Sequence, residues 1–519
     1  MRKRHPLLRD YVRPARSFLL TILASLAACA GNEQRALDLA AQAQVEADAG
    51  QLAAARKTIA AAIRERDDLA QLYIEKGRIE IAAKSYQDAF TAYSEASSLD
   101  AANFEALQAI ARLGILLGYA KEARDATERL LILQPADPDA LMVAGLLALD
   151  RRQPDEAAAF AERILQRNRS DERGLVLKAR TQFFRGDSAG ALATLKANAA
   201  GPPGEATCLT LLELYRARSD ATGMMEQFAC LRVSRSADSR LRVDEANVLY
   251  KIGDMAKARA ILRDVVTGPG VPADVVGHAR VLWQAYDPAV YEGANPPRFR
   301  DGYARRAVAK FFLDDGKPRR AGAILGNGKS VADKALWARI AVADGSAMGL
   351  SAATQILDRD KTQCDALLAS AAARTRSGDL AGAVTAAQRA VAECPDDPGT
   401  YLQLAASNRA GRNRLAETRA FDAGLAAHPQ DVNVATTYYA RAVQDGHPEL
   451  ALAVARRFTR GAPSLPNAWV MLVRACQLVD DVACAQQAKA GLDKAGSSYR
   501  LDPLPGELPS GNALGQLRQ

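Results

Sequence analysis

The sequence predicts an all-α solenoid, because the same residue types recur every 34 positions and because the composition favours helices. Apolar residues make up 49% of the 519 residues, but aromatic residues only 6%, and the excess is alanine and leucine. Both are strong helix formers, and alternating runs rich in Val, Ile, Thr and Tyr are missing. Single cores stop growing near about 250–300 residues, so a chain of this length is expected to hold several domains or a repeat array.

The repeats begin at Ala36 and continue without a break for five steps of 34 residues. The eighth position of each step is small, and so is the twentieth. The residues are Ala43, Gly77, Ala111, Gly145 and Ala179 at position 8, and Ala55, Ala89, Ala123, Ala157 and Ala191 at position 20. The same spacing returns from residue 364, with further starts at 398, 432 and 466. Between the two blocks the pattern is weaker, with repeats starting near Ser239 and Gly302.

Small residues at these positions let two helices of a hairpin, and the next hairpin, approach closely. A proline at position 32, such as Pro135, ends the second helix because it cannot continue one. Each hairpin leaves an apolar face uncovered, so neighbouring hairpins must stack. The pattern resembles the tetratricopeptide-repeat (TPR) family, with the second repeat carrying Tyr73, Gly77, Tyr86, Ala89, Tyr93 and Ala96. The resemblance covers about 90% of the chain after its leader and implies a TPR α-solenoid, a right-handed superhelix of about 12 helical hairpins.

Residues 1–28 are typical of a secretory leader, with a basic start followed by a short apolar stretch. They carry much of the net charge of +8, so the remaining chain is close to neutral and nucleic acid is not an expected partner. Leu26-Ala27-Ala28-Cys29 resembles the lipobox of bacterial lipoproteins, which implies cleavage before Cys29 and its lipidation. The alternative is an ordinary signal peptide. Ala30 stands where an aspartate would retain such a protein at the inner membrane, so an outer-membrane lipoprotein facing the periplasm is expected.

The other six cysteines form three pairs, and in each pair the two repeat positions add up to about 30. In a hairpin that turns near position 15, two residues whose positions add up to about 30 face each other. The predicted disulfides are Cys208–Cys230, Cys364–Cys394 and Cys476–Cys484. Such bonds suit an oxidising compartment, although buried free cysteines are the alternative. The spacings do not match zinc sites. No metal and no cofactor is expected.

The sequence shows no catalytic constellation, so the chain is not expected to be an enzyme. The segment from Gly322 to Ser330 contains Gly-Lys-Ser, but its Ala323 stands where a phosphate-binding loop needs glycine, and no strand precedes it. We therefore interpret this segment as a loop.

In TPR superhelices the first helix of each repeat lines the concave face, which usually takes the ligand. The resemblance places three arginines, Arg78, Arg112 and Arg180, at position 9 there, with Met142, Phe183 and Phe184 on the same surface. The second arm contributes Arg409 and Arg474. An arginine groove suits carboxylates of a peptide or an acidic polysaccharide. The alternative is that these arginines are solvated or paired with neighbouring acids.

These features divide the chain by residue number. They predict a signal peptide over 1–28, a lipidated tether over 29–35, an N-terminal TPR arm over 36–205, a divergent TPR or linker region over 206–363, a C-terminal TPR arm over 364–496 and a disordered tail over 497–519. The favoured function is a membrane-anchored scaffold that binds protein partners of the cell envelope during assembly of a pilus or secretion system. The alternatives are an exopolysaccharide export or biosynthesis factor that binds acidic glycan, and an enzyme fused to the repeats.

Overall fold

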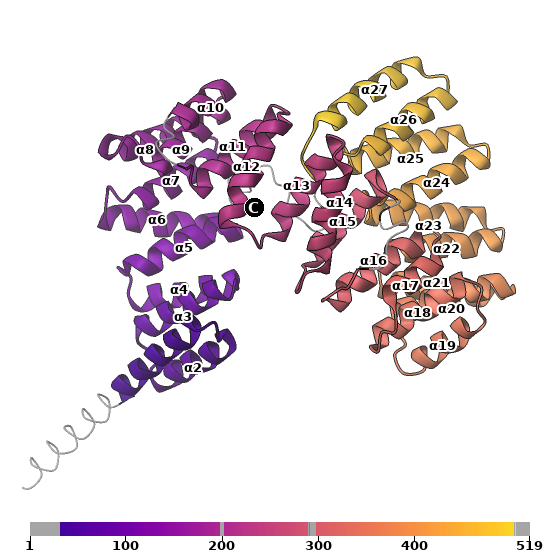
Figure 1. The fold of residues 1–519 in the computed structure, drawn as a ribbon, viewed down its shortest axis with the longest axis horizontal. Helices are drawn as coiled ribbons and strands as arrows, with labels where there is room; N and C mark the ends of the chain where they lie inside the picture. The colour runs from indigo at the N-terminus through magenta and orange to yellow at the C-terminus, as the bar shows by residue number, and fades with distance from the viewer. Residues whose placement is uncertain (1–31, 198–201, 289, 291–296, 503, 505–519) are drawn as a thin grey trace, which may run out of the picture. The chain divides into compact units, whose positions relative to one another are not determined.

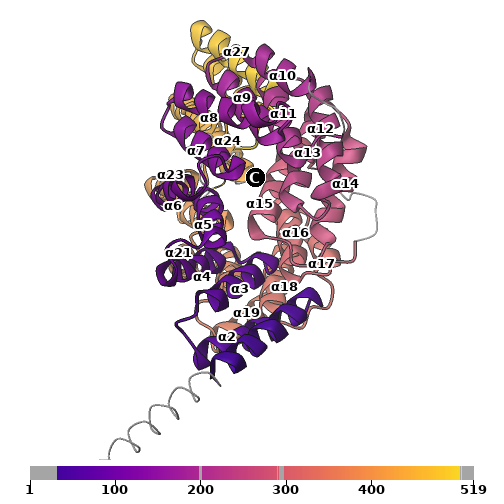
Figure 2. The ribbon, with the colours of Figure 1, turned by 90° about the vertical axis from the view of Figure 1, so that its left-hand side faces the viewer.

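The structure is a computed structural model that describes residues 32–197, 202–288, 290, 297–502 and 504, and over these ranges it is helical without strands (Figures 1 and 2). The leader and Cys29 lie outside the described residues. The chain divides into two compact units, the first ending at Thr210 and the second running from Leu211 to Pro509. Apart from the helix over Ala273–Tyr286, consecutive helices in each unit pair as hairpins, whose first helix we name helix A and whose second we name helix B.

The first unit holds a helix over residues 32–48 and nine labelled helices. They are α2 (Leu52–Glu65), α3 (Ala70–Ala82), α4 (Tyr86–Leu99), α5 (Phe104–Leu117), α6 (Ala120–Leu133), α7 (Pro138–Asp150), α8 (Pro154–Arg167), α9 (Glu172–Phe184) and α10 (Ser188–Ala197). The A helices α3, α5, α7 and α9 begin at the repeat starts predicted from the 34-residue step.

The second unit begins within α11 and continues the series to the end of the described chain. Its helices are α11 (Glu205–Ala217), α12 (Ala221–Ser234), α13 (Ser239–Lys251), α14 (Met255–Thr267), α15 (Ala273–Tyr286), α16 (Gly302–Asp314), α17 (Pro318–Leu325), α18 (Val331–Ala343), α19 (Met348–Leu357), α20 (Cys364–Ser377), α21 (Leu380–Glu393), α22 (Pro398–Ala410), α23 (Arg414–Ala427), α24 (Val432–Gln444), α25 (Pro448–Gly461), α26 (Pro466–Leu478) and α27 (Val482–Ser497). The region with the weak repeat pattern therefore also consists of helices.

Polar caps and prolines explain why the A helices start where they do. Asn103 and Asp137 each accept a hydrogen bond from a backbone N–H of the first turn of α5 and α7. Asp397 and Asp431 do the same for α22 and α24. These caps satisfy N–H groups that have no partner within the helix. Pro138 occupies the first position of α7, where a missing N–H costs nothing.

The close approach of helices at the small positions is confirmed. The alanines at position 20, from Ala55 to Ala191, are all fully buried. At position 8, a Cβ added to Gly77 would lie 2.6 Å from the ring of Tyr93, and one added to Gly145 would lie 2.2 Å from a methyl of Leu177. Real Cβ atoms do not approach other atoms so closely. Larger residues would therefore force the hairpins apart.

Two predicted boundaries differ from the structure. Residues 32–35, expected within the tether 29–35, are helical. Of the predicted disordered tail, Ser497 ends α27, and the following residues up to Asp502 lie along helices α11, α13 and the start of α26. Asn247 of α13 donates to the carbonyl of Tyr499 at 3.0 Å, and Arg500 pairs with Glu213 of α11 at 2.7 Å. Side chains of the second unit therefore bind this segment. Residues 505–519 lie outside the described residues.

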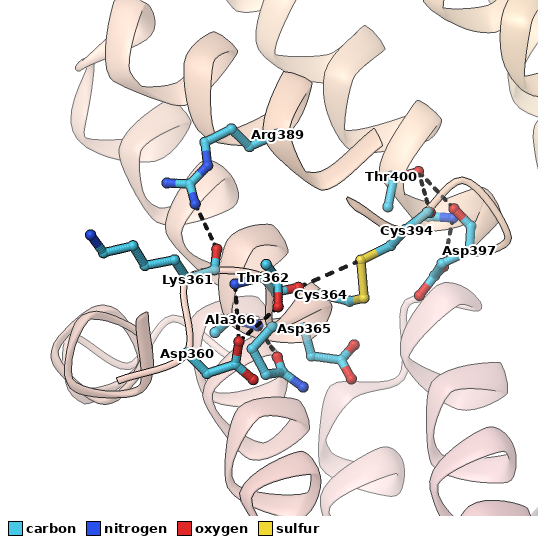
Figure 3. The surroundings of a disulfide bond; sticks show 12 residues. Asp360, Lys361, Thr362, Cys364, Asp365, Ala366, Arg389, Cys394, Asp397 and Thr400 are labelled. Atoms are coloured by element: carbon cyan, nitrogen blue, oxygen red, sulfur yellow. Dashed lines mark hydrogen bonds between the residues drawn. A yellow bond between two sulfur atoms is a disulfide. The ribbon is translucent and has the colours of Figure 1, made fainter. Parts of the chain in front are cut away.

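Two of the predicted cysteine pairs are joined in the structure. The disulfide Cys364–Cys394 ties the start of α20 to the end of α21 (Figure 3) and closes a sequence separation of 30. The disulfide Cys476–Cys484 ties α26 to α27 with a separation of 8. Cys208 belongs to the first unit and Cys230 to the second, so their pairing stays a prediction. Among the described residues, no helix is both long and apolar enough to cross a membrane.

We expect Gly461→Ala to destabilise the second unit by about 1–3 kcal/mol, because the new methyl overpacks a rigid contact. Its Cβ would lie 2.5 Å from the ring of Pro429 and 2.6 Å from the Pro429 carbonyl oxygen. Gly496→Ala in α27 is the matched control, since nothing lies within 4 Å of its Cβ. Alanine there should be neutral or stabilising by up to about 1 kcal/mol. Urea unfolding measures the midpoint of both variants, and equal midpoints would contradict the prediction.

We expect the double variant Cys364→Ala/Cys394→Ala to lose about 3–4 kcal/mol of unfolding free energy, because the open chain regains loop entropy. The variant Cys476→Ala/Cys484→Ala opens a shorter loop, so its loss should be smaller by about 1 kcal/mol. Urea unfolding under oxidising conditions measures both. Adding a reductant to the wild-type protein should also lower the urea midpoint. If neither the substitutions nor the reductant change this midpoint, the disulfides do not stabilise the fold.

Candidate partner-binding surfaces

In the first unit, two of the three arginines predicted to line the groove form ion pairs with acids of the next A helix. Arg78 of α3 donates through Nε to Glu105 of α5 at 2.7 Å and through Nη1 to Glu75 at 2.6 Å. Arg112 of α5 pairs with Asp139 of α7 at 3.2 Å. Arg78 and Arg112 thus belong to a ladder of alternating charges along consecutive A helices, as the alternative interpretation expected.

This ladder remains accessible. The side chains of Arg78 and Arg112 are 47% and 57% exposed. Exposed ion pairs contribute at most about 1 kcal/mol, because water and salt screen them. A partner can therefore exchange these pairs for its own at little cost. The surface is one of alternating charge, and not the uniformly cationic groove predicted from the arginines alone.

The other predicted residues of this surface differ in their placement. The prediction that Arg180 lies in an open groove is wrong, because its side chain is buried and its Nε donates to Thr210 Oγ1 at 3.1 Å. Met142 is half-buried and packs on the core of the first unit. Phe183 is half-buried, whereas Phe184 is 41% exposed at the end of α9. Only Arg78, Arg112 and Phe184 of this set are therefore available at the surface.

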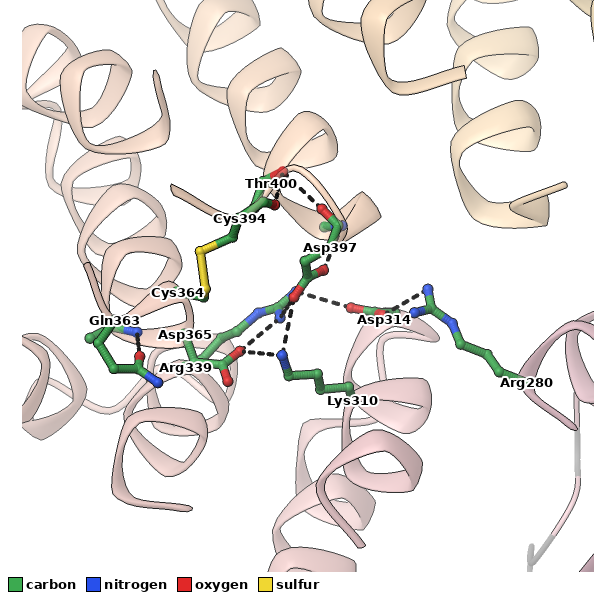
Figure 4. Close-up of polar contacts among 12 residues, drawn as sticks. Arg280, Lys310, Asp314, Arg339, Gln363, Cys364, Asp365, Cys394, Asp397 and Thr400 are labelled. Carbon is green, nitrogen blue, oxygen red and sulfur yellow. Dashed lines mark hydrogen bonds and ion pairs between the residues drawn. A yellow bond between two sulfur atoms is a disulfide. The ribbon is translucent and has the colours of Figure 1, made fainter. Parts of the chain in front are cut away.

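In the second unit, long basic side chains of α15, α16 and α18 form a buried ion network (Figure 4). Arg339 lies at its centre and pairs with Asp314 at 3.1 Å and with Asp365 at 3.2 Å. Lys310 pairs with Asp365 at 3.2 Å and with Asp397 at 3.1 Å. The carboxylates come from α16, from the start of α20 and from the N-cap of α22, so five helices contribute to one cluster.

Arg280 of α15 extends this network to the N-cap of α24. It pairs with Asp314 at 3.3 Å and with Asp431 at 3.0 Å, across a sequence separation of 151. Burial raises the pKa of Asp314 against the attraction of Arg339 and Arg280. Burial also opposes ionisation of Asp397, but Lys310, Arg339 and Arg280 hold the pKa of this carboxyl well below its usual range.

The network fills the inner face of the second unit with the chain's own charges. Breaking a buried pair by removing one partner typically costs about 3–5 kcal/mol, because the other charge is left buried alone. The sequence analysis missed this cluster, although it contained a signal. Lys310 and Arg339 occupy position 9 of their A helices, and Asp397 and Asp431 directly precede the repeat starts at 398 and 432. The unit therefore offers no open cationic groove at these helices.

The last segment of the second unit is held by Lys251 at the end of α13. Its ammonium donates to the carbonyls of Ser464 at 2.9 Å and Ala495 at 3.0 Å, and to that of Ser498. Burial lowers the pKa of Lys251 to about 8. Asp502 accepts hydrogen bonds from the amide and hydroxyl of Ser464 at 3.0 and 2.8 Å. The end of the second unit is thereby fixed to α13, one of the first A helices of that unit.

The two arginines predicted for the second arm behave differently from each other. Arg409 pairs with Glu417 and with Asp445, each at 3.1 Å, so its charge is neutralised. The same two acids line a cavity of about 230 Å³ between α23, α24 and α25. Arg474 is exposed and makes no ion pair within the described part of the chain. The second arm therefore contributes one accessible arginine of the predicted pair.

Comparisons with known proteins agree with this architecture. Two tetratricopeptide-repeat family models match residues 109–172 and 365–407. No curated protein matches the chain. Among solved structures, a tetratricopeptide-repeat protein from Parabacteroides merdae is similar, with 19% identity, a TM-score of 0.40, and coverage of 48% of this chain and 98% of that one.

Two further solved structures are similar over shorter stretches. A thermophilic TPR protein from Thermus thermophilus has 22% identity and a TM-score of 0.32, covering 35% of this chain and 98% of its own. PilF from Pseudomonas aeruginosa has 15% identity and a TM-score of 0.31, covering 40% of this chain and 95% of its own. The family models fall on α5–α9 and α20–α22, within blocks where hairpins recur every 34 residues. The chain is thus a helical solenoid in which family models identify tetratricopeptide repeats in both units.

Proposed function

We propose that this chain is a lipid-anchored scaffold of the bacterial envelope, attached through Cys29 to the outer membrane and facing the periplasm. In this proposal it binds protein partners during assembly of a pilus or secretion system. The docking surface is the accessible A-helix ladder of the first unit, which includes Arg78, Arg112 and Phe184.

A contrast between the two units carries the choice of surface. In the first unit, Arg78 and Arg112 pair only within their own helix or with the next A helix, and both stay about half exposed. In the second unit, basic side chains of the network form ion pairs with acids from distant parts of the same chain, as in the pair Arg280–Asp431. A surface with weak, exposed and alternating pairs can accept a partner's charges and hydrogen bonds, and complementary charges give such an interface its specificity.

The compartment rests on two independent features. One is the leader with its lipobox at Leu26–Cys29. The other is the set of disulfides in the repeats, since such bonds persist in oxidising compartments such as the periplasm. Pilus assembly and secretion are proposed because the chain resembles TPR lipoproteins of Gram-negative bacteria that serve these systems, although the resemblance does not select one of them.

The glycan-export alternative rests on the arginines at position 9, and the structure supports it less than the protein scaffold. Arg180 is buried, and Arg78 and Arg112 already have carboxylate partners. A polyanion would have to displace these acids along the whole ladder. The stripe therefore favours a protein with both signs of charge over an acidic polysaccharide.

We expect Arg78→Glu/Arg112→Glu to reduce recovery of the protein partner at least tenfold, because reversed charges face the acids of the ladder and of the partner. The full-length protein is cross-linked in cells of a Gram-negative host, and its partners are identified by mass spectrometry. Arg151→Glu is the matched control, since it breaks an exposed pair with Glu156 at a hairpin turn. Pilus or secretion components lost only from the double variant support the proposal, and unchanged recovery would refute the surface.

We expect Cys29→Ser to release the protein from membranes, because the acyl chains supply the anchoring energy. Ala30→Asp should keep the lipid and move the protein from the outer to the inner membrane. Membrane fractionation and mass spectrometry of the N-terminal peptide measure both outcomes. A wild-type protein without acyl groups in the soluble fraction would overturn the anchor while leaving the docking surface testable in solution.

A further inference from the structure

A pocket lies in the second unit where two B helices are short. Helix α17 has 8 residues and α19 has 10, whereas the B helices α21, α23 and α25 have 14 each. A loop over residues 326–330 replaces the missing end of α17. Both short helices pack against α18, and a hollow of about 430 Å³ lies between this loop, α18 and α19.

The wall of the pocket is fixed by its own contacts. Gly326 has φ +58°, which favours glycine, and a Cβ on Gly328 would lie 2.4 Å from the Cβ of Asp333. Ser330 and Asp333 form a capping box at the start of α18. Asp333 also pairs with Arg305 at 2.9 Å. The loop is therefore preformed, and the carboxylate of Asp333 is already satisfied.

Four other polar side chains line the same pocket and have no protein partner. They are Asn327, Lys334, Trp337 and Gln355, and none of these side chains forms a hydrogen bond or ion pair in the described part of the chain. The indole of Trp337 is 40% exposed. By contrast, Trp283 is buried and Trp469 donates to the carbonyl of Pro463 at 2.9 Å. Of the three tryptophans, Trp337 is the one placed to contact a ligand.

The chemistry of this lining fits a sugar better than a phosphate. The face of an indole is negative and attracts the weakly positive C–H face of a pyranose ring. Amides of Asn327 and Gln355 can both donate to and accept from hydroxyls. The ammonium of Lys334 suits a carboxylate. A phosphate at the start of α18 would meet the carboxylate of Asp333, which already accepts the N–H of Ser330, while the Ser330 hydroxyl accepts the N–H of Asp333.

We propose that the pocket between the 326–330 loop, α18 and α19 binds a residue of an acidic saccharide. Trp337 stacks on the sugar ring, Lys334 pairs with its carboxylate, and Asn327 and Gln355 bind its hydroxyls. The volume lies within the range of ligand sites, about 300–1,000 Å³. This site is separate from the arginine ladder and does not depend on the proposed protein scaffold.

The test is isothermal titration of the purified full chain with trigalacturonic acid, with a mannuronic acid trimer and with neutral maltotriose. At least one acidic trimer should bind at least tenfold more tightly than maltotriose at low salt. That preference should shrink in 0.5 M NaCl, because salt screens the exposed Lys334. Quenching of Trp337 fluorescence provides a second readout at the pocket itself.

Variants separate the pocket from the rest of the chain. Trp337→Ala should weaken binding of the acidic trimer at least tenfold. Lys334→Gln should lower the affinity for the acidic trimer to that for maltotriose. Trp469→Phe is the matched control and should bind as wild type does. Thermal unfolding of each variant shows that the fold is kept.

Three results would overturn the proposal. They are absence of binding for both acidic trimers, equal affinity for acidic and neutral trimers, and an affinity that Trp337→Ala leaves unchanged. If the sugars fail to bind and Trp337→Ala instead abolishes cross-linking to one identified protein, the pocket is an anchor for a protein side chain and the saccharide assignment is wrong. None of these results bears on the docking surface of the first unit.

Discussion

The hairpins of the first unit depend on helices meeting at positions that hold alanine or glycine. Ala89 is fully buried, and Gly77 has no room for a Cβ against Tyr93. This contact sets the distance between the helices of one hairpin and the stacking of the next, so the array can bury a continuous core from units that are too small to be stable alone. Because the helices lie so close together, mostly small and aliphatic side chains fill the core, and few aromatic residues are needed.

Position 9 of the A helices shows how one site in a repeat can serve two purposes. In the first unit Arg78 reaches the adjacent helix and stays half exposed, where the pair is weak and replaceable. In the second unit Lys310 and Arg339 reach acids that cap A helices much later in the chain. Buried charges of this kind fix geometry, because leaving one unpaired is costly. The same periodic pattern thus yields one accessible surface and one that is internally satisfied.

Departures from the repeat are where specific recognition arises. The shortened helices α17 and α19 expose Trp337 and Lys334 beside a rigid glycine loop. The residues after α27, which an ideal repeat would leave free, are instead held by Asn247 of α13 and Glu213 of α11. Regular hairpins build the scaffold, and irregular ones provide shapes and unpaired polar groups that a regular stack cannot offer. Local conflicts with an ideal pattern are expected at functional sites.

The sequence by itself determined the helical hairpins, their starts at Ala70 and Phe104, and the facing cysteines Cys364 and Cys394. These features depend on contacts within about 34 residues, where helix geometry fixes which positions meet. Only the tertiary structure decided the burial of Arg180, the docking of the segment after Ser497 and the pair Arg280–Asp431. The curvature of the stack brings such residues together, and it accumulates from small rotations at every interface between hairpins. A position within a repeat states which way a side chain faces, but not what lies opposite it.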